Sequence, residues 1–153
     1  MAKQRIKVIR EEMLQVANNV AQEKNIDKDS VFEAMEQALE KIPQSSYFRF
    51  ADFGSADGGT SQELWYNLIQ SIRASGDQRP IEMLYTDLAS NDFSTLFKSM
   101  QGMNENTSWD YQKKFENVYV HGCGTGFHKQ LLSSGTLSLG FSATAMHYVS
   151  EKP

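Results

Sequence analysis

The stretch "FRFADFGSADGGTSQELW", residues 48–65, decides the fold class. An apolar run ends in an acid, three glycines follow within six residues, and a helical pattern then begins. This order predicts a buried strand that passes through a glycine-rich loop into a helix. The loop lacks the Gly-Lys-Ser/Thr of a phosphate-binding loop and the G-x-G-x-x-G spacing of a dinucleotide fingerprint. On this stretch alone, a ligand-binding loop and a simple tight turn both remain open.

The bulk composition is that of one globular domain. The chain has 153 residues, 40% apolar and 22% charged, with a net charge of −4, which gives no electrostatic footprint for nucleic acid or anionic membrane. The single cysteine, Cys123, excludes an internal disulfide and a zinc cluster built on several thiolates. His121 and His128 would share a face only within one continuous helix, which the glycines between them disfavour, so we expect no metal site. No apolar run approaches the roughly 18 residues of a membrane span, and the first residues do not form a secretory signal. We therefore expect a cytoplasmic protein.

Helical and strand patterns alternate along the chain. Strands are predicted over residues 48–53, 81–87, 115–122 and 137–143, and helices over residues 4–23, 31–42, 61–73, 91–100 and 127–132. Residues 104–114 are polar and predict an exposed loop. This order predicts the α/β class, with a mostly parallel sheet of about four strands, crossover helices and two preceding N-terminal helices. We expect a helical segment over residues 1–43 and an α/β domain over residues 44–153.

In a parallel sheet, ligands lie beyond the carboxyl ends of the strands. That rule selects residues 52–59, 87–88, 122–127 and 142–148. Asp52 is placed to pair with an ammonium group or to orient the glycine loop. Asp87 would stand beside that loop, where a carboxylate accepts both hydroxyls of a ribose, and it indicates an adenosine-containing ligand. The alternative for Asp87 is an N-cap or turn acid.

The last two strand ends are more ambiguous. Phe127, which follows three glycines, suits an adenine slotted against an aromatic face, or else belongs to the core of a short helix. His147 and Tyr148 are either hydrogen-bond donors facing a substrate or ordinary residues of an amphipathic helix. Cys123 has no visible base to activate it as a nucleophile.

Taken together, "FADFGSADGGTS", "YTDLASNDFSTLFKSM" and "GTGFHKQLLSSGTLSLGFSATAMHYVSEKP" resemble the SABATH family of S-adenosylmethionine-dependent carboxyl methyltransferases in order and spacing. The resemblance covers residues 48–153 and implies a partial Rossmann-like methyltransferase fold with S-adenosylmethionine as cofactor. It implies contacts to the methionine part from Asp52, Gly54 and Ser55, a loop shaped by Asp57, Gly58 and Gly59, ribose binding by Asp87, and adenosine contacts from Leu88, Gly126 and Phe127.

The resemblance also implies that His147 and Tyr148 position the acceptor, the carboxylate of a small organic acid. Gly126 stands where plant members usually carry serine, and Tyr148 replaces the usual tryptophan. A carboxylic acid is already ionised at neutral pH, so the implied methyl transfer needs no general base and depends on alignment.

The chain departs from the family in two ways. Residues 1–42 lack its Tyr-x-x-x-Ser-x-x-Gln segment, and residues 11–42 instead resemble the first helices of bacterial NusA, which face RNA polymerase. The family also continues beyond the position of Pro153 for about as long again, so we expect the acceptor-binding cap to be missing and the exposed sheet edge to favour a homodimer or aggregation. Two further hypotheses follow: a non-catalytic NusA-like interaction module fused to a partial α/β domain, and a nucleotide-binding oxidoreductase fragment.

Overall fold

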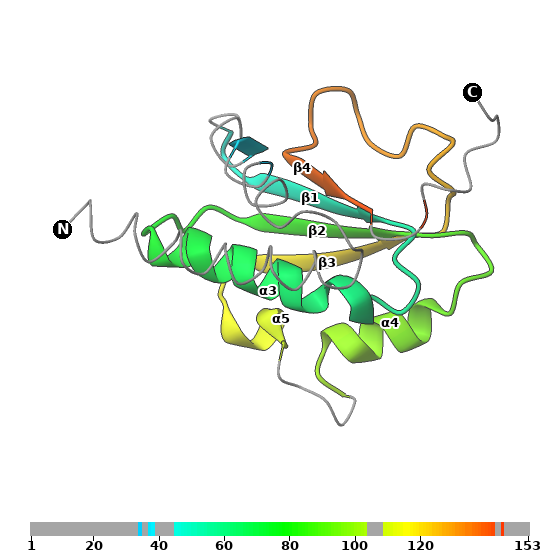
Figure 1. Ribbon diagram of the computed structural model, residues 1–153, viewed down its shortest axis with the longest axis horizontal. Coiled ribbons are helices and arrows are strands. Elements are labelled where there is room, and N and C mark those ends of the chain that lie inside the picture. Colours follow the sequence, from blue (N-terminus) through cyan, green and yellow to red (C-terminus); the bar gives the residue numbers. More distant parts are fainter. Residues whose placement is uncertain (1–33, 35–36, 39–44, 104–108, 143–144, 146–153) are drawn as a thin grey trace.

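The structure is a computed structural model in which residues 34, 37, 38, 45–103, 109–142 and 145 are described. Its centre is a four-stranded sheet in the order β3-β2-β1-β4 (Figure 1). The strands are β1 (Phe48–Phe53), β2 (Ile81–Thr86), β3 (Val118–Cys123) and β4 (Leu139–Phe141), and every pairing is parallel. The predicted α/β class and the four-stranded parallel sheet are confirmed.

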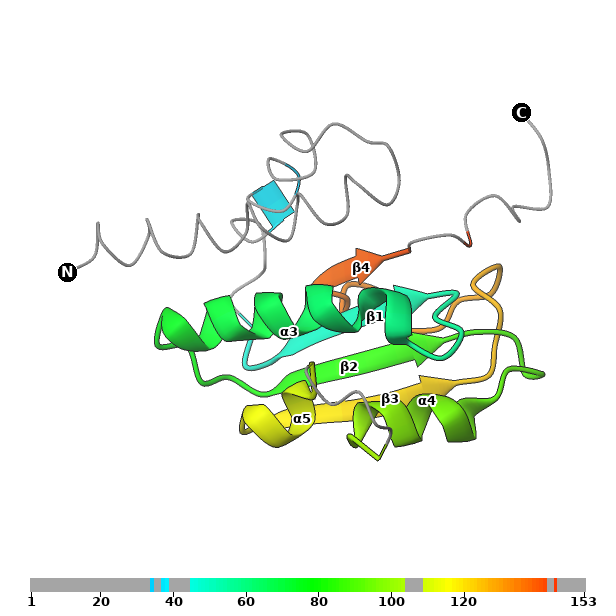
Figure 2. The ribbon, with the colours of Figure 1, turned by 60° about the horizontal axis from the view of Figure 1, so that its bottom comes forward.

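In the part of the chain that is described, three helices cover one face of this sheet (Figure 1). Helix α3 (Gly59–Ala74) connects β1 to β2, and α4 (Phe93–Met100) and α5 (Tyr111–Lys114) lie between β2 and β3. Figures 1 and 2 show all three on the same side of the sheet. Residues 124–138 carry the chain from β3, at one edge, across the other face to β4 at the opposite edge.

The core lies between the sheet and the helices α3, α4 and α5. Alternate residues of β1 face α3, and the ring of Phe50 stacks on that of Trp65 with centroids 5.8 Å apart. Burial of each such side chain contributes about 1.5–3 kcal/mol. The buried apolar cluster consists of Phe48, Phe50, Trp65, Leu68, Ile69, Ile72, Ile81, Met83, Tyr85, Leu96, Met100, Tyr111 and Val118.

Two predictions about the helices are wrong. Residues 127–132 form a turn followed by irregular backbone rather than a helix, with the Lys129 N–H bonded to the Gly126 carbonyl at 3.1 Å. The stretch predicted as an exposed loop contains α5, whose Tyr111 is 1% exposed. Asp110 caps this helix by accepting the Lys113 N–H at 3.1 Å.

The predicted helix over residues 4–23 lies outside the described residues. Of the predicted helix over residues 31–42, residues 34, 37 and 38 are described and are helical. Within the described ranges, no helix combines the length and apolar character that crossing a bilayer requires.

Candidate functional site

The strand order creates a switch point between β1 and β4, because the chain leaves β1 toward β2 on one side and β4 joins on the other. Ligands of open α/β sheets bind at such a point, beyond the carboxyl ends of the strands. The segment after β4 returns to the glycine loop there: a Cβ on Gly54 would lie 2.1 Å from the Cβ of Ala145. Gly54 also has a φ of +73°, so both its backbone and its surroundings require glycine.

The first half of the glycine loop is anchored to β2 by its backbone. The N–H groups of Gly54 and Ser55 donate to the Thr86 carbonyl at 2.8 and 3.1 Å. The buried hydroxyl of Ser55 lies 3.4 Å from the same carbonyl oxygen. These polar groups therefore have protein partners already.

The second half of the loop begins α3. Gly58 is the N-cap residue with a φ of +78°, and a Cβ there would lie 2.7 Å from the Cε of Met100. Exposed Asp57 accepts the Gly59 N–H at 3.0 Å and so supports the first turn of the helix. Packing and capping explain this half of the loop.

Asp52 lies beneath the loop and is 2% exposed. Its Oδ2 accepts hydrogen bonds from the Ser61 hydroxyl and, at 3.4 Å, from the Trp65 indole N–H. Burial raises the pKa of Asp52, the two hydrogen bonds oppose that rise, and the nearby charge of Asp87 adds to it. Because Ser61 and Trp65 belong to α3, the Asp52 carboxylate faces that helix.

Asp87, directly after β2, connects two loops. Its Oδ2 accepts the Ala56 N–H and its Oδ1 accepts the Leu88 N–H, both at 2.7 Å. The Asn91 side-chain amide donates to the Ala56 carbonyl at 2.8 Å. Asp87 thus acts in part as a turn acid, whereas the N-cap of α4 is Asp92, which accepts the Thr95 N–H.

The loop after β3 packs against the loop after β2. A Cβ on Gly126 would lie 3.3 Å from the Cδ2 of Leu88, and one on Gly124 would lie 3.4 Å from the Cα of Ala89. Leu88 itself is 61% exposed. Phe127 is half-buried, and its ring lies 4.8 Å from that of His128. Because residues 127–132 do not form a helix, the interpretation of Phe127 as the core of a short helix is wrong.

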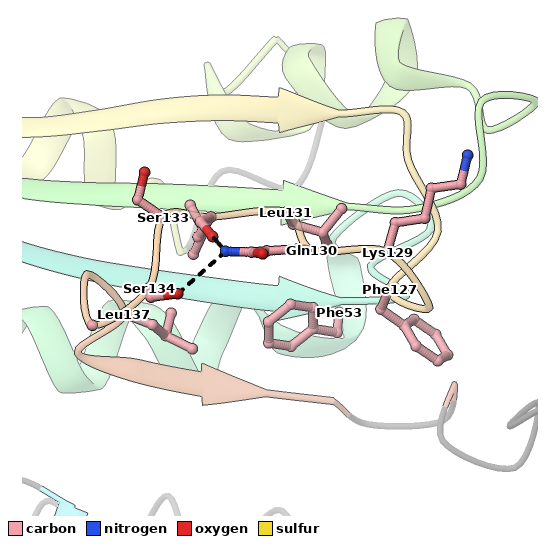
Figure 3. A pocket seen from close by; sticks show the side chains of 10 residues that line it. Phe53, Phe127, Lys129, Gln130, Leu131, Ser133, Ser134 and Leu137 are labelled. Carbon is pink, nitrogen blue, oxygen red and sulfur yellow. Dashed lines mark hydrogen bonds between the residues drawn. The ribbon is translucent and has the colours of Figure 1, made fainter.

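A cavity of about 460 Å³ lies on the sheet face opposite the helices (Figure 3). Phe53, Phe127, Leu137 and residues 129–135 line it. The Gln130 amide spans part of the loop by donating to the Leu132 carbonyl at 2.9 Å. In Figure 3, Lys129 extends away from Phe53, whereas the Gln130 side chain lies near that ring.

The sequence-predicted site is thus assembled in part. The structure joins Asp87 to the glycine loop and Leu88 to Gly126, and it buries Asp52 under the same loop. His147 and Tyr148 lie outside the described residues. The sequence analysis did not identify Ala56 or Asn91 as site residues. The position of Asn91 directly before Asp92, the N-cap of α4, is the sequence signal that places Asn91 in the loop after β2. In the part of the chain that is described, no three His, Cys, Asp or Glu side chains gather as metal ligands.

The parallel sheet, the glycine loop at its switch point and the acid after β2 define a partial Rossmann-like α/β protein. A family model described as "SAM dependent carboxyl methyltransferase" matches residues 14–153. The chain belongs to this family, and the predicted SABATH membership is confirmed. The match includes residues 14–42, most of the segment for which a resemblance to NusA was expected, and nothing in these comparisons supports that expectation.

Individual relatives agree with the family assignment. Methyltransferase FUS9 of Gibberella moniliformis is 28% identical over 127 residues, covering 80% of this chain and 33% of that protein. Probable 7-methylxanthine methyltransferase 5 of Theobroma cacao is 31% identical over 110 residues, covering 67% of this chain and 28% of that protein. The chain therefore spans about a third of the length of the curated relatives it matches.

A solved structure, "Loganic acid methyltransferase with SAH", superimposes with a TM-score of 0.53 at 18% identity. It covers 95% of this chain, which covers 35% of it. At this identity the likeness shows the fold, and it agrees with a partial Rossmann-like sheet.

Proposed function

We propose that the chain forms the donor-binding part of a methyltransferase that uses S-adenosylmethionine and methylates the carboxylate of a small organic acid. The observation that carries this proposal is the position of Asp87. A half-buried carboxylate at the end of a central strand contacts the backbone of the glycine loop at 2.7 Å. An acceptor for ribose hydroxyls and a close-approach loop are therefore adjacent.

The hydrogen-bonding capacity of Asp87 fits a ribose. An ionised carboxylate offers about four lone-pair sites, and the N–H groups of Ala56 and Leu88 use one on each oxygen. The remaining sites accept the two ribose hydroxyls. In this proposal exposed Leu88 covers one face of the adenosine, Phe127 stacks on the adenine, and Gly126 leaves room between them.

The methionine end of the donor is assigned to the glycine loop, with Gly54, Ser55, Asp57 and Gly58 as its wall. Because the Gly54 and Ser55 N–H groups already bond to β2, these residues act mainly through the shape of the backbone. Asp52, near the end of β1, bonds to Ser61 and Trp65 and so joins its strand to α3 beneath the loop. In this proposal its role is to support the loop and to add negative charge on the side of the donor's ammonium group.

The chemistry requires little of the protein beyond alignment. When bound, the donor supplies an electrophilic methyl group on a sulfonium sulfur. An acceptor acid of ordinary pKa is ionised at neutral pH and needs no general base. His147 and Tyr148 are proposed to orient that carboxylate in line with the methyl group, since such positioning supplies much of the rate enhancement.

Isothermal titration with S-adenosylhomocysteine, the unreactive product, tests donor binding. We expect the chain to bind it and Asp87→Ala to lower the affinity about tenfold or more, because hydrogen bonds to a charged group contribute about 1.5–3 kcal/mol. Asp92→Ala, which removes an acid from the same loop but only uncaps α4, should leave the affinity unchanged. No binding at high micromolar ligand, an unaffected Asp87→Ala variant, or preferential binding of NAD would contradict the proposal.

The acceptor class needs a separate assay, because the relatives' names include a methylxanthine as well as loganic acid. Incubation with methyl-labelled donor and a panel of small acids and xanthines should yield base-labile methyl esters. Transfer only to xanthine nitrogen would contradict the carboxylate assignment while leaving donor binding intact.

A further inference from the structure

The Ala56 peptide is held from both sides by side chains of the loop after β2. Its N–H donates to Asp87 Oδ2 at 2.7 Å, and its carbonyl accepts from Asn91 Nδ2 at 2.8 Å. We call these two contacts the Ala56 bridge. Ala56 has a φ of +49°, a left-handed conformation that is unfavourable for a residue with a Cβ. The bridge therefore holds a conformation that the residue does not favour by itself.

The middle of the glycine loop is held by side chains, whereas the residues on either side of it are held by backbone hydrogen bonds. Gly54 and Ser55 are fixed by backbone bonds to Thr86, and Gly58 donates to the Ser55 carbonyl at 2.8 Å. The Ala56 peptide between them is held by two side chains instead. Because Asp87 is the proposed ribose acid, the bridge also sets the distance between that acid and the middle of the loop.

We infer that Asn91 is a positioning residue for donor binding, acting through Ala56 without touching the donor. The inference rests on the proposed function. With Asn91 in place, the loop is pre-organised to receive the amino-acid end of S-adenosylmethionine. Without the Asn91 side-chain amide, the Asp87 carboxylate still accepts the ribose hydroxyls, but Ala56 is free to leave the left-handed conformation.

If Asn91 had a purely structural role, its loss would disturb α4 or the sheet. Its side chain lies outside the buried core cluster, and Asp92 rather than Asn91 caps α4. Loss of the Asn91 amide should therefore have little effect on α4 or the sheet. Its effect should appear selectively in ligands that contact the glycine loop.

The test compares two ligands that share the adenosine half. S-adenosylhomocysteine carries the amino-acid end, and 5′-methylthioadenosine lacks it. For Asn91→Ala we expect the affinity for S-adenosylhomocysteine to fall roughly two- to tenfold, the value of one neutral hydrogen bond, with 5′-methylthioadenosine affected less than twofold. Isosteric Asn91→Asp, which cannot donate to the Ala56 carbonyl when ionised, should show the same selective loss. Asp92→Ala should lower the melting temperature and leave both affinities unchanged.

Amide hydrogen exchange supplies a second measurement that needs no ligand. In the free chain, Asn91→Ala should accelerate exchange at the Ala56 amide while leaving the Gly54 amide, bonded to Thr86, unchanged.

The outcomes separate the two proposals. If the unmodified chain binds neither ligand, the proposed function fails and the positioning role fails with it. If the chain binds both ligands but Asn91→Ala weakens them equally or not at all, the positioning role is overturned and the proposed function stands. Unchanged exchange at the Ala56 amide in Asn91→Ala would overturn the claim that the Asn91 contact holds the conformation of Ala56.

Discussion

The buried tyrosine pair between β2 and α5 allows a quantitative test of the packing under the site. The hydroxyls of Tyr85 and Tyr111 are 2.6 Å apart, and both side chains are at most 1% exposed. Tyr111 donates to the Met100 sulfur at 3.2 Å, so Tyr85 donates to Tyr111. Burial raises the pKa of both phenols, which keeps them neutral across the physiological range.

The direction of this hydrogen-bond chain makes the two single substitutions unequal. Tyr111→Phe leaves the buried Tyr85 hydroxyl without an acceptor and should cost about 1–3 kcal/mol of unfolding free energy. Tyr85→Phe leaves Tyr111 with its bond to Met100 and should cost about 1 kcal/mol or less. The double variant removes both hydroxyls, so it should cost less than the sum, with a coupling of about 1 kcal/mol.

Urea denaturation at neutral pH measures these differences. Fluorescence of buried Trp65 and far-ultraviolet circular dichroism should report the same transition, with m-values unchanged among the four proteins. Two results would refute the reasoning: single costs that add within about 0.3–0.5 kcal/mol, or a Tyr85→Phe variant less stable than Tyr111→Phe.

Three further predictions concern single side chains. Burial raises the pKa of Asp52 in the folded protein above 3.8, so folding favours the protonated carboxyl group. The unfolding free energy of the wild type relative to that of Asp52→Asn should therefore fall as the pH rises from about 4 through the folded pKa. Urea titrations at successive pH values measure this difference, and a rise in the relative unfolding free energy over that range would contradict the prediction. Gly54→Ala should lose at least about 1–2 kcal/mol because its φ is +73°. Gly59→Ala, whose Cβ would have the flexible Asp57 side chain as its nearest neighbour, should be nearly neutral in the same assay. Arg79→Lys should lower the unfolding free energy by about 0.5–1 kcal/mol, because lysine cannot reproduce the contact that Nε and Nη2 of Arg79 make with the partly exposed Asp77 carboxylate. If the loss is equally large in 1 M salt, the contribution of this pair is not ionic.

The alternation of residues along β1 predicts which way the Asp52 side chain points, and the interpretation of Asp52 as a ligand acid did not take this into account. The predicted strand over residues 48–53 matches β1 at both ends. Within it, Phe48, Phe50 and Asp52 recur with a period of two and therefore share one face. Because Phe48 and Phe50 face the core, the same periodicity directs Asp52 toward α3, where Ser61 and Trp65 meet it.

The errors in helix placement have local physical causes. The stretch over residues 127–132 has Phe127 and Leu131 four residues apart, at helical spacing, but glycines before it and Ser133–Ser134–Gly135 after it leave only six residues, too few for a stable helix without strong packing. In contrast, α5 is only Tyr111–Lys114, and it forms because Asp110 caps it and Tyr111 is buried. A composition-based reading cannot weigh one buried aromatic side chain against several polar neighbours.

The contacts that assemble the candidate site could not be predicted. Ala56 is separated by 31 residues from Asp87 and by 35 from Asn91, so their contacts depend on the pairing of β1 with β2 and on the exact lengths of both loops. The sequence placed Asp87 at the correct strand end. It offered no signal that a left-handed alanine would join that acid to the glycine loop.

The short β4 strand affects the order in which the molecule assembles. Only three residue pairs join it to β1, and the bond from the Arg49 N–H to Ser138 spans 89 residues, compared with 33 for the bond from Arg49 to Glu82 across β1 and β2. Closing the longer loop costs about 0.9 kcal/mol more conformational entropy. We therefore expect β4 to dock last during folding and to detach first in local opening. Since β4 forms one wall of the switch point, a ligand bound there would favour molecules in which this last strand has docked, and would slow hydrogen exchange in β4 more than in the strands already in place.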